Sequence, residues 1–133
     1  MIIVNNKICQ LQPLFPECWK KRHLLAIAHV KSHDGRPRRL ILFVHYSNPR
    51  AREACDLDFD FLMRNLKAKY PQDIILSLGD FNRSRAEMQR LAATHQLQLT
   101  TLTGNIDYTR EQRLGLRTVR SELDYILCYT PSN

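Results

Sequence analysis

The chain has 133 residues, of which 20 are lysine or arginine and 13 are aspartate or glutamate, giving a formal net charge of +7. This length fits a single domain, residues 1–133, with enough core to fold without disulfides or a structural metal. With 44% hydrophobic and 25% charged residues, the composition excludes a disordered or collagen-like chain. The apolar runs are too short to cross a bilayer, so no membrane partner is expected.

The four cysteines are scattered without a C-x-x-C pair, and the first residues lack the pattern of a secretory signal. These features predict reduced thiols and an intracellular protein, cytoplasmic or nuclear. Positive charge gathers between Arg36 and Arg39 and again between Arg110 and Arg120. A nucleic-acid partner and a merely soluble cationic surface explain this charge equally well.

The first half of the chain predicts strands followed by a helix. Residues 2–9, 23–31 and 39–46 are predicted to be extended, and the Asp34-Gly35 turn makes the second and third adjacent antiparallel strands. From residue 51 the apolar period becomes helical and continues to Tyr70. The expected buried stripe of this helix consists of Ala54, Leu57, Phe61, Leu62 and Leu66.

The second half alternates strand and helix. A short apolar strand is expected at 73–78, and Ser84 with Glu87 forms a capping box that opens a second helix. Further strands are predicted at 97–101 and 123–129, separated by a polar, arginine-rich loop over 103–120. The order β-β-β-α-β-α-β-loop-β indicates an α/β fold, a mixed sheet with flanking helices.

The tetrapeptide Gly79-Asp80-Phe81-Asn82 follows the buried strand directly. A carboxylate there can activate water or hold Mg²⁺, and an amide N–H can bind a phosphoryl oxygen, as phosphodiester hydrolysis requires. The alternative is an Asx-turn that caps the next helix, with Gly79 permitting the bend. Asp124 lies within the last apolar strand, where an acid is costly unless it faces a polar pocket.

Three segments together resemble the endonuclease/exonuclease/phosphatase superfamily, in particular the apurinic-endonuclease-like domain of non-LTR retrotransposons. They are the strand that ends in Tyr46 and Pro49, the strand followed by Gly79-Asp80-Phe81-Asn82, and Ser121-x-x-Asp124-Tyr125-Ile126. The resemblance covers roughly residues 23–128. It implies a partial four-layered α/β sandwich, truncated at both ends and corresponding to the central part of such a domain.

The resemblance also implies roles for individual residues. Asp80 would position and activate the attacking water, and Asn82 would bind the scissile phosphate. Tyr46 would contact that phosphate through its phenol, and Asp124 would orient a catalytic histidine. The arginines of the loop before Asp124 would contact the nucleic-acid backbone; they are Arg113, Arg117 and Arg120.

Three groups that the resemblance calls for have no match in this sequence: the metal-binding glutamate, an asparagine on an early strand, and the histidine of a final Asp-His pair. The family expects Mg²⁺, but the residues that would hold it here are unknown. We therefore expect a remnant of a Mg²⁺-dependent phosphodiesterase, inactive alone and retained for binding DNA, RNA or a larger nucleoprotein complex, or self-associating through open sheet edges. The alternative is an active endonuclease that another chain or a longer gene product completes.

Overall fold

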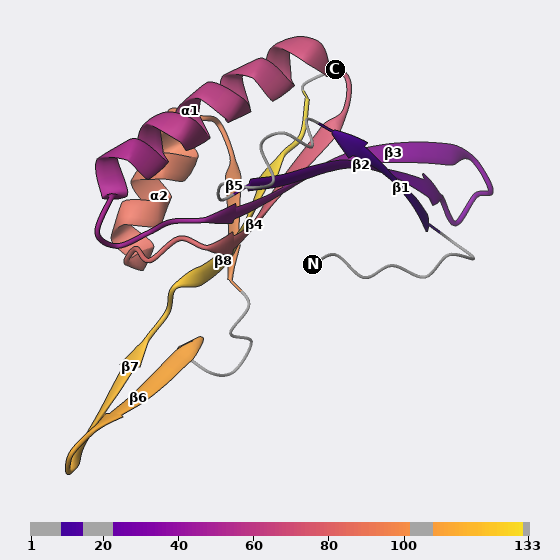
Figure 1. The fold of residues 1–133 in the computed structure, drawn as a ribbon. Coiled ribbons are helices and arrows are strands. Elements are labelled where there is room, and N and C mark those ends of the chain that lie inside the picture. The colour runs from indigo at the N-terminus through magenta and orange to yellow at the C-terminus, as the bar shows by residue number, and fades with distance from the viewer. Residues whose placement is uncertain (1–8, 15–22, 102–107, 132–133) are drawn as a thin grey trace.

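A computed structural model describes residues 9–14, 23–101 and 108–131 of the chain (Figure 1). The described residues form eight strands and two helices. In chain order they are β1 (Cys9–Leu14), β2 (His23–Lys31), β3 (Pro37–Tyr46), α1 (Arg52–Lys69), β4 (Ile74–Asp80), α2 (Arg85–Thr94), β5 (Gln98–Thr101), β6 (Arg110–Leu114), β7 (Arg117–Ser121) and β8 (Asp124–Tyr129).

Six of these strands form one mixed sheet in the order β1-β2-β3-β4-β8-β5. Strands β3 and β4 run parallel and are connected by α1, whereas the other neighbouring pairs of this sheet are antiparallel. The last strand of the chain, β8, lies between β4 and β5, which α2 connects. The predicted α/β class, with a mixed sheet and flanking helices, is therefore confirmed.

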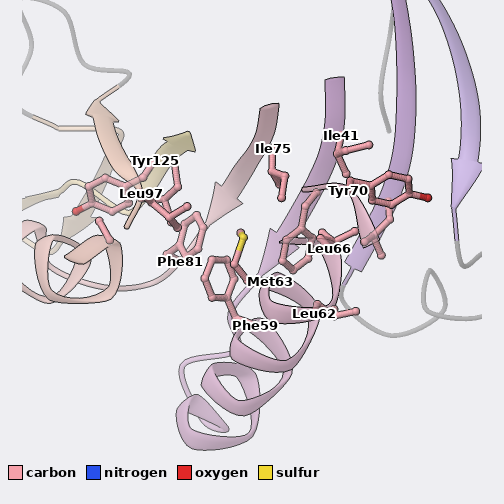
Figure 2. Close-up of a cluster of buried hydrophobic side chains, with 14 of the residues drawn as sticks. Ile41, Phe59, Leu62, Met63, Leu66, Tyr70, Ile75, Phe81, Leu97 and Tyr125 are labelled. Atoms are coloured by element: carbon pink, nitrogen blue, oxygen red, sulfur yellow. The ribbon is translucent and has the colours of Figure 1, made fainter. Parts of the chain in front are cut away.

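Both helices pack on the same face of the sheet, because their buried residues share one cluster with alternate residues of the strands. In β3, Ile41 and Phe43 are fully buried on the helix side, while Leu42 and Val44 point to the other face and are half-buried. Figure 2 shows the side chains of α1 packed against the strands in this core. The cluster includes Leu25, Ile41, Phe43, Phe59, Met63, Leu66, Ile75, Phe81, Met88, Tyr125 and Leu127.

The predicted buried stripe of α1 is wrong in part. Leu62 and Leu66 are buried as expected, but Ala54 is exposed, and Leu57 and Phe61 are 71% and 66% exposed. The helix buries a neighbouring stripe instead, which contains Cys55, Phe59, Leu62, Met63 and Leu66. Both stripes have helical spacing, so periodicity alone does not choose between them; the aromatic contacts of Phe59 inside the core do.

The loop predicted over 103–120 is also corrected. Residues 102–107 lie outside the described residues, but β6 and β7 form a two-stranded hairpin from Arg110 to Ser121. Gly115 has φ 62° and takes the first of the two turn positions, as a two-residue hairpin turn requires. Every residue of β6 is exposed, and because the hairpin buries so little, its sequence lacks the apolar alternation by which strands are recognised.

Other local predictions hold. Ser84 and Glu87 form the expected capping box at α2, and β2 and β3 pair antiparallel across the turn at Gly35. Of the predicted strand 2–9, residues 2–8 lie outside the described part, and the first described strand is β1, Cys9–Leu14. The three described cysteines are free thiols. Neither described helix has both the length and the apolar character of a membrane span.

Candidate functional site

Three predicted site residues lie in one row across the end of the sheet. Tyr46 at the end of β3 is directly opposite Asp80 of β4, and Asp80 is directly opposite Asp124 of β8. Residues opposite each other on neighbouring strands point to the same face, with Cβ atoms about 5 Å apart. Tyr125, one position along β8, is buried among the core residues, so this row, Tyr46-Asp80-Asp124, faces away from the helices.

Gly79 makes the close approach of β3 and β4 possible. Its φ is +149°, and a Cβ atom at this position would lie 1.8 Å from the carbonyl oxygen of His45. Any side chain would collide with the backbone of β3, so the residue before Asp80 must be glycine for the strands to remain paired. Steric exclusion by β3 therefore explains why glycine precedes Asp80 at the point where the row is formed.

Asn82 fixes the turn that follows the row. Its backbone is left-handed, with φ 47°, a conformation that asparagine tolerates better than most residues. Its N–H donates to Oδ1 of Asp80 at 2.9 Å, and its Nδ2 donates to the carbonyl oxygen of Ser47 at 2.6 Å. The Asx-turn considered from the sequence is thus present, whereas the cap of α2 is Ser84. Among the described residues, the second N–H of the Asn82 amide and its Oδ1 have no hydrogen-bond partner and are available to a ligand.

Burial is the main cause of the shifted pKa of Asp80. It raises the pKa of the Asp80 carboxyl above its ordinary value, and the nearby negative charge of Asp124 raises it further. The N–H of Asn82 and the positive charge of Arg110 act in the opposite direction. The carboxyl therefore holds its proton more tightly than an exposed aspartate, as expected for a group that accepts a proton during a reaction.

Tyr125, to which the sequence analysis assigned no role, connects the segment that follows β4 with the segment that precedes β8. Its Oη lies 3.0 Å from the carbonyl oxygens of Arg83 and Glu122. Burial raises the pKa of Tyr125 to about 12, so the phenol keeps its hydrogen at neutral pH and remains a donor. Arg85 and Glu122 add an ion pair of 2.9 Å between α2 and the residue preceding β8. An aromatic residue beside an expected site acid was the available signal for this role.

The three predicted nucleic-acid-binding arginines lie on the β6–β7 hairpin, which projects away from the sheet (Figure 1). Arg113 and Arg117 flank its turn and are exposed. Arg120 lies nearer the sheet, where its Nε is 2.9 Å from Oε2 of Glu111 and its guanidinium is 4.8 Å from the centre of the Tyr108 ring. At the tip, Leu116 is fully exposed.

The residues of the row supply few ligands for a metal. Among the described residues, no group of three or more histidine, cysteine, aspartate or glutamate side chains is arranged to hold one. Asp80 and Asp124 provide two neighbouring carboxylates. Mg²⁺ is commonly held by one or two carboxylates when substrate phosphate oxygens and water complete its shell. This donor set fits a metal that arrives with its substrate better than one that is bound tightly beforehand.

Comparisons with known proteins identify the fold. The chain is similar to D. rerio TDP2 complexed with single-strand DNA product, with 14% identity and a TM-score of 0.58, over 96% of this chain and 56% of that one. It is also similar to TDP2 from C. elegans, with 17% identity and a TM-score of 0.53, over 92% of this chain and 40% of that one. TDP2 is a member of the endonuclease/exonuclease/phosphatase superfamily.

Because the identities are below 20%, these likenesses establish the fold alone. The chain spans about half the length of the structures that it matches. No protein-family model matches the sequence, and no curated protein does.

Proposed function

We propose that this chain is a nucleic-acid-binding relative of Mg²⁺-dependent phosphodiesterases, derived from a retrotransposon endonuclease and acting inside the cell. The observation that carries the proposal is the exposed hairpin with Arg113 and Arg117 near its turn, joined to the strand that begins with Asp124. By the register, Arg113 and Arg117 lie on opposite faces of the hairpin, so the two can contact phosphates on either side of it. The DNA complex of the similar D. rerio TDP2 supports the same partner.

The row Tyr46-Asp80-Asp124 then lies where a bound phosphodiester would pass. We infer that these residues, with Asn82, contact the phosphate but do not cleave it at a useful rate in this chain alone. Asp80 and Asp124 are the two acids of the row, and a metal glutamate and a catalytic histidine find no match in the sequence. Loss of single members of a catalytic unit typically costs several orders of magnitude in rate.

The second candidate is an active metal-dependent endonuclease that is completed by another chain or by more of the same gene product. The observation that favours it is the convergence of Tyr46, Asp80 and Asp124, together with the raised pKa of Asp80. In that case Asp80 and Asp124 would hold Mg²⁺ together with substrate oxygens, and the metal would neutralise charge on the phosphate. Asp80 would then accept the proton of the attacking water.

We further propose that the chain associates with itself or with a larger nucleoprotein complex. Strands β1 and β5 form the two edges of the six-stranded sheet, and exposed strand edges recruit partner strands. On the face without helices, Leu42, Leu76 and Ile126 are half-buried, which adds apolar surface for a partner. Light scattering on the purified chain tests this point, and a monodisperse monomer at high concentration contradicts it.

Binding is tested by fluorescence anisotropy with a 20-base-pair duplex and with single-stranded DNA and RNA of equal length. We expect the R113Q/R117Q double variant to bind at least about tenfold more weakly than the unmodified chain. Arg38 lies at the far end of β3 and Arg90 lies on α2, so an R38Q/R90Q variant carries the same loss of charge away from the hairpin and should retain most of the affinity. Equal affinity for all three proteins contradicts the hairpin as the interface.

Cleavage is tested separately with plasmid, abasic-site DNA and single-stranded RNA in Mg²⁺ or Mn²⁺. We expect no metal-dependent cleavage above background. Cleavage that disappears in the Asp80→Ala variant establishes the second candidate in place of the first.

A further inference from the structure

Arg110 lies where the hairpin joins the candidate site. It opens β6 and pairs with Ser121, the last residue of β7. The preceding residue, Thr109, donates its N–H to the carbonyl oxygen of Ser121 at 3.0 Å. Its hydroxyl oxygen accepts the N–H groups of Leu123 at 2.9 Å and Asp124 at 3.2 Å. The first of these bonds closes the base of the hairpin, and the other two tie it to the strand end that carries Asp124.

The Arg110 guanidinium is exposed, and Nη2 lies 3.3 Å from Oε1 of Gln112. Within the described ranges it takes part in no ion pair, in contrast to Arg120, which is paired with Glu111. Its charge nevertheless acts on the row, because it lowers the pKa of Asp80 against the larger effect of burial. Arg110 therefore combines an available guanidinium with a position near the acids.

Electrostatics explain why such a cation matters. Two ionised carboxylates on neighbouring strands repel an approaching phosphate. The described residues at the row include no third metal-binding side chain to strengthen a cation site. Arginine remains charged at any physiological pH and binds two phosphate oxygens at once, so it can offset this repulsion from within the chain itself.

We propose that Arg110 binds the phosphodiester group that lies against the row Tyr46-Asp80-Asp124, while Arg113 and Arg117, nearer the hairpin turn, bind other phosphates of the nucleic acid. This inference rests on the proposed function and names the contact that brings the nucleic-acid backbone to the row. Each strand of the hairpin has five residues, a length of about 15 Å. A ligand of two nucleotides that binds at the row is therefore too short to reach the hairpin tip.

The first experiment uses this difference in reach. A thymidine dinucleotide, which contains one phosphodiester, is titrated into isotope-labelled protein while the amide NMR signals of Gly79, Asp80, Asn82 and Asp124 are followed. We expect these signals to shift saturably and the apparent Kd to rise about tenfold in R110Q, which loses a charge-assisted contact. The R38Q variant has the same net charge as R110Q, and it should bind the dinucleotide as tightly as the unmodified chain does. R110K should recover part of the affinity, because it keeps the charge without the planar fork.

A second measurement requires no ligand. The carbon signal of the Asp80 carboxyl is titrated with pH in the unmodified chain, R110Q and R38Q. Loss of the Arg110 charge should raise the pKa of Asp80, and loss of the Arg38 charge should leave it unchanged. A purely structural role for Arg110, visible as reduced thermal stability, does not predict this difference.

The outcomes separate the inference from the proposed function. If R110Q binds the dinucleotide as tightly as the unmodified chain, Arg110 is not the phosphate ligand, and the inference is overturned. In that case a loss of duplex affinity in R113Q/R117Q still supports the hairpin as a nucleic-acid interface. If the unmodified chain binds neither the dinucleotide nor the duplex, the proposed function fails and the inference fails with it.

Discussion

Gly79 and the carbonyl group of His45 occupy neighbouring strands at a spacing that leaves no room for a side chain. The Cβ position of residue 79 lies 1.8 Å from the His45 oxygen and 2.9 Å from its carbonyl carbon. These are backbone atoms of a paired strand and cannot move aside as a flexible side chain would. Glycine at position 79 therefore lets the end of β4 lie close against β3, one residue before Asp80.

The first prediction follows from this contact. Gly79→Ala should lower the free energy of unfolding by more than about 3 kcal/mol, because the strands must separate to admit the methyl group. Gly35→Ala is the matched control: Gly35 has a positive φ of 77° but open space around its Cβ position. It should cost only about 1 kcal/mol. Urea unfolding followed by circular dichroism measures both, and equal losses contradict the steric explanation.

The second prediction compares two phenylalanines of α1. Phe59 is 1% exposed and packs within 5.4 Å, between ring centres, of Phe43 and of His45. Phe59→Ala should therefore cost about 3–5 kcal/mol of unfolding free energy. Phe61 is 66% exposed, and Phe61→Ala should change stability by less than about 0.5 kcal/mol. A large loss for Phe61→Ala in the same unfolding experiment would restore the stripe that the sequence predicted.

The third prediction concerns the pH dependence of stability. Asp80 binds its proton more tightly in the folded chain, so stability falls as the pH rises above the ordinary pKa and through the raised one, where the buried carboxyl ionises. Asp80→Asn should therefore raise the thermal midpoint at neutral pH. The gain should vanish as the pH falls below 3.8, the ordinary value, because the carboxyl is then protonated in both the folded and the unfolded chain.

Asp73→Asn is the control for this measurement. Asp73 accepts two hydrogen bonds of 2.9 Å from Nε of Arg39, one on each carboxylate oxygen, and lies 2.7 Å from its Nη2. Removing its charge should lower the midpoint at neutral pH instead of raising it. A lower midpoint for Asp80→Asn at neutral pH contradicts the cost assigned to burying that carboxylate.

The fourth prediction concerns the salt dependence of nucleic-acid binding. The logarithm of the binding constant should fall linearly with the logarithm of salt concentration, since each neutralised phosphate releases counterions. Arg113→Gln and Arg117→Gln should each reduce this slope by about 1, and should do so for any duplex sequence. Anisotropy titrations between about 50 and 200 mM salt provide the slopes. A slope that neither substitution changes excludes direct phosphate contacts by these two residues.

Much of the fold was predictable because its signals are local. The capping box of Ser84 and Glu87, the Asp34-Gly35 turn and the apolar strands around Ile41 and Ile75 each depend on a few neighbouring residues. The hairpin at Arg110–Ser121 was missed because its strands bury almost nothing, and burial is what produces alternation. The exposed positions of Leu57 and Phe61 depend on which side of α1 meets the sheet, which only tertiary packing decides.

The candidate site shows the same division. The motifs indicated Tyr46, Asp80 and Asp124 as members of a site. The strand register places the three directly opposite one another on neighbouring strands. Their chemical roles remain predictions. The sequence held no comparable signal for Arg110, because its significance comes from the hydrogen bonds of Thr109 to a strand end 14 residues away. Long-range contacts of this kind leave no local pattern.

The position of β8 between β4 and β5 has a consequence for how the protein is made. A ribosome releases β4, α2 and β5 before β8 exists, so the slot between β4 and the edge strand β5 stays empty until residue 129 has emerged. During that interval both flanking strands expose unpaired N–H and C=O groups, which are prone to wrong pairing. Chains arrested before β8 should therefore depend on chaperones far more than the finished protein, and closure of the slot should coincide with the assembly of the row at Asp124.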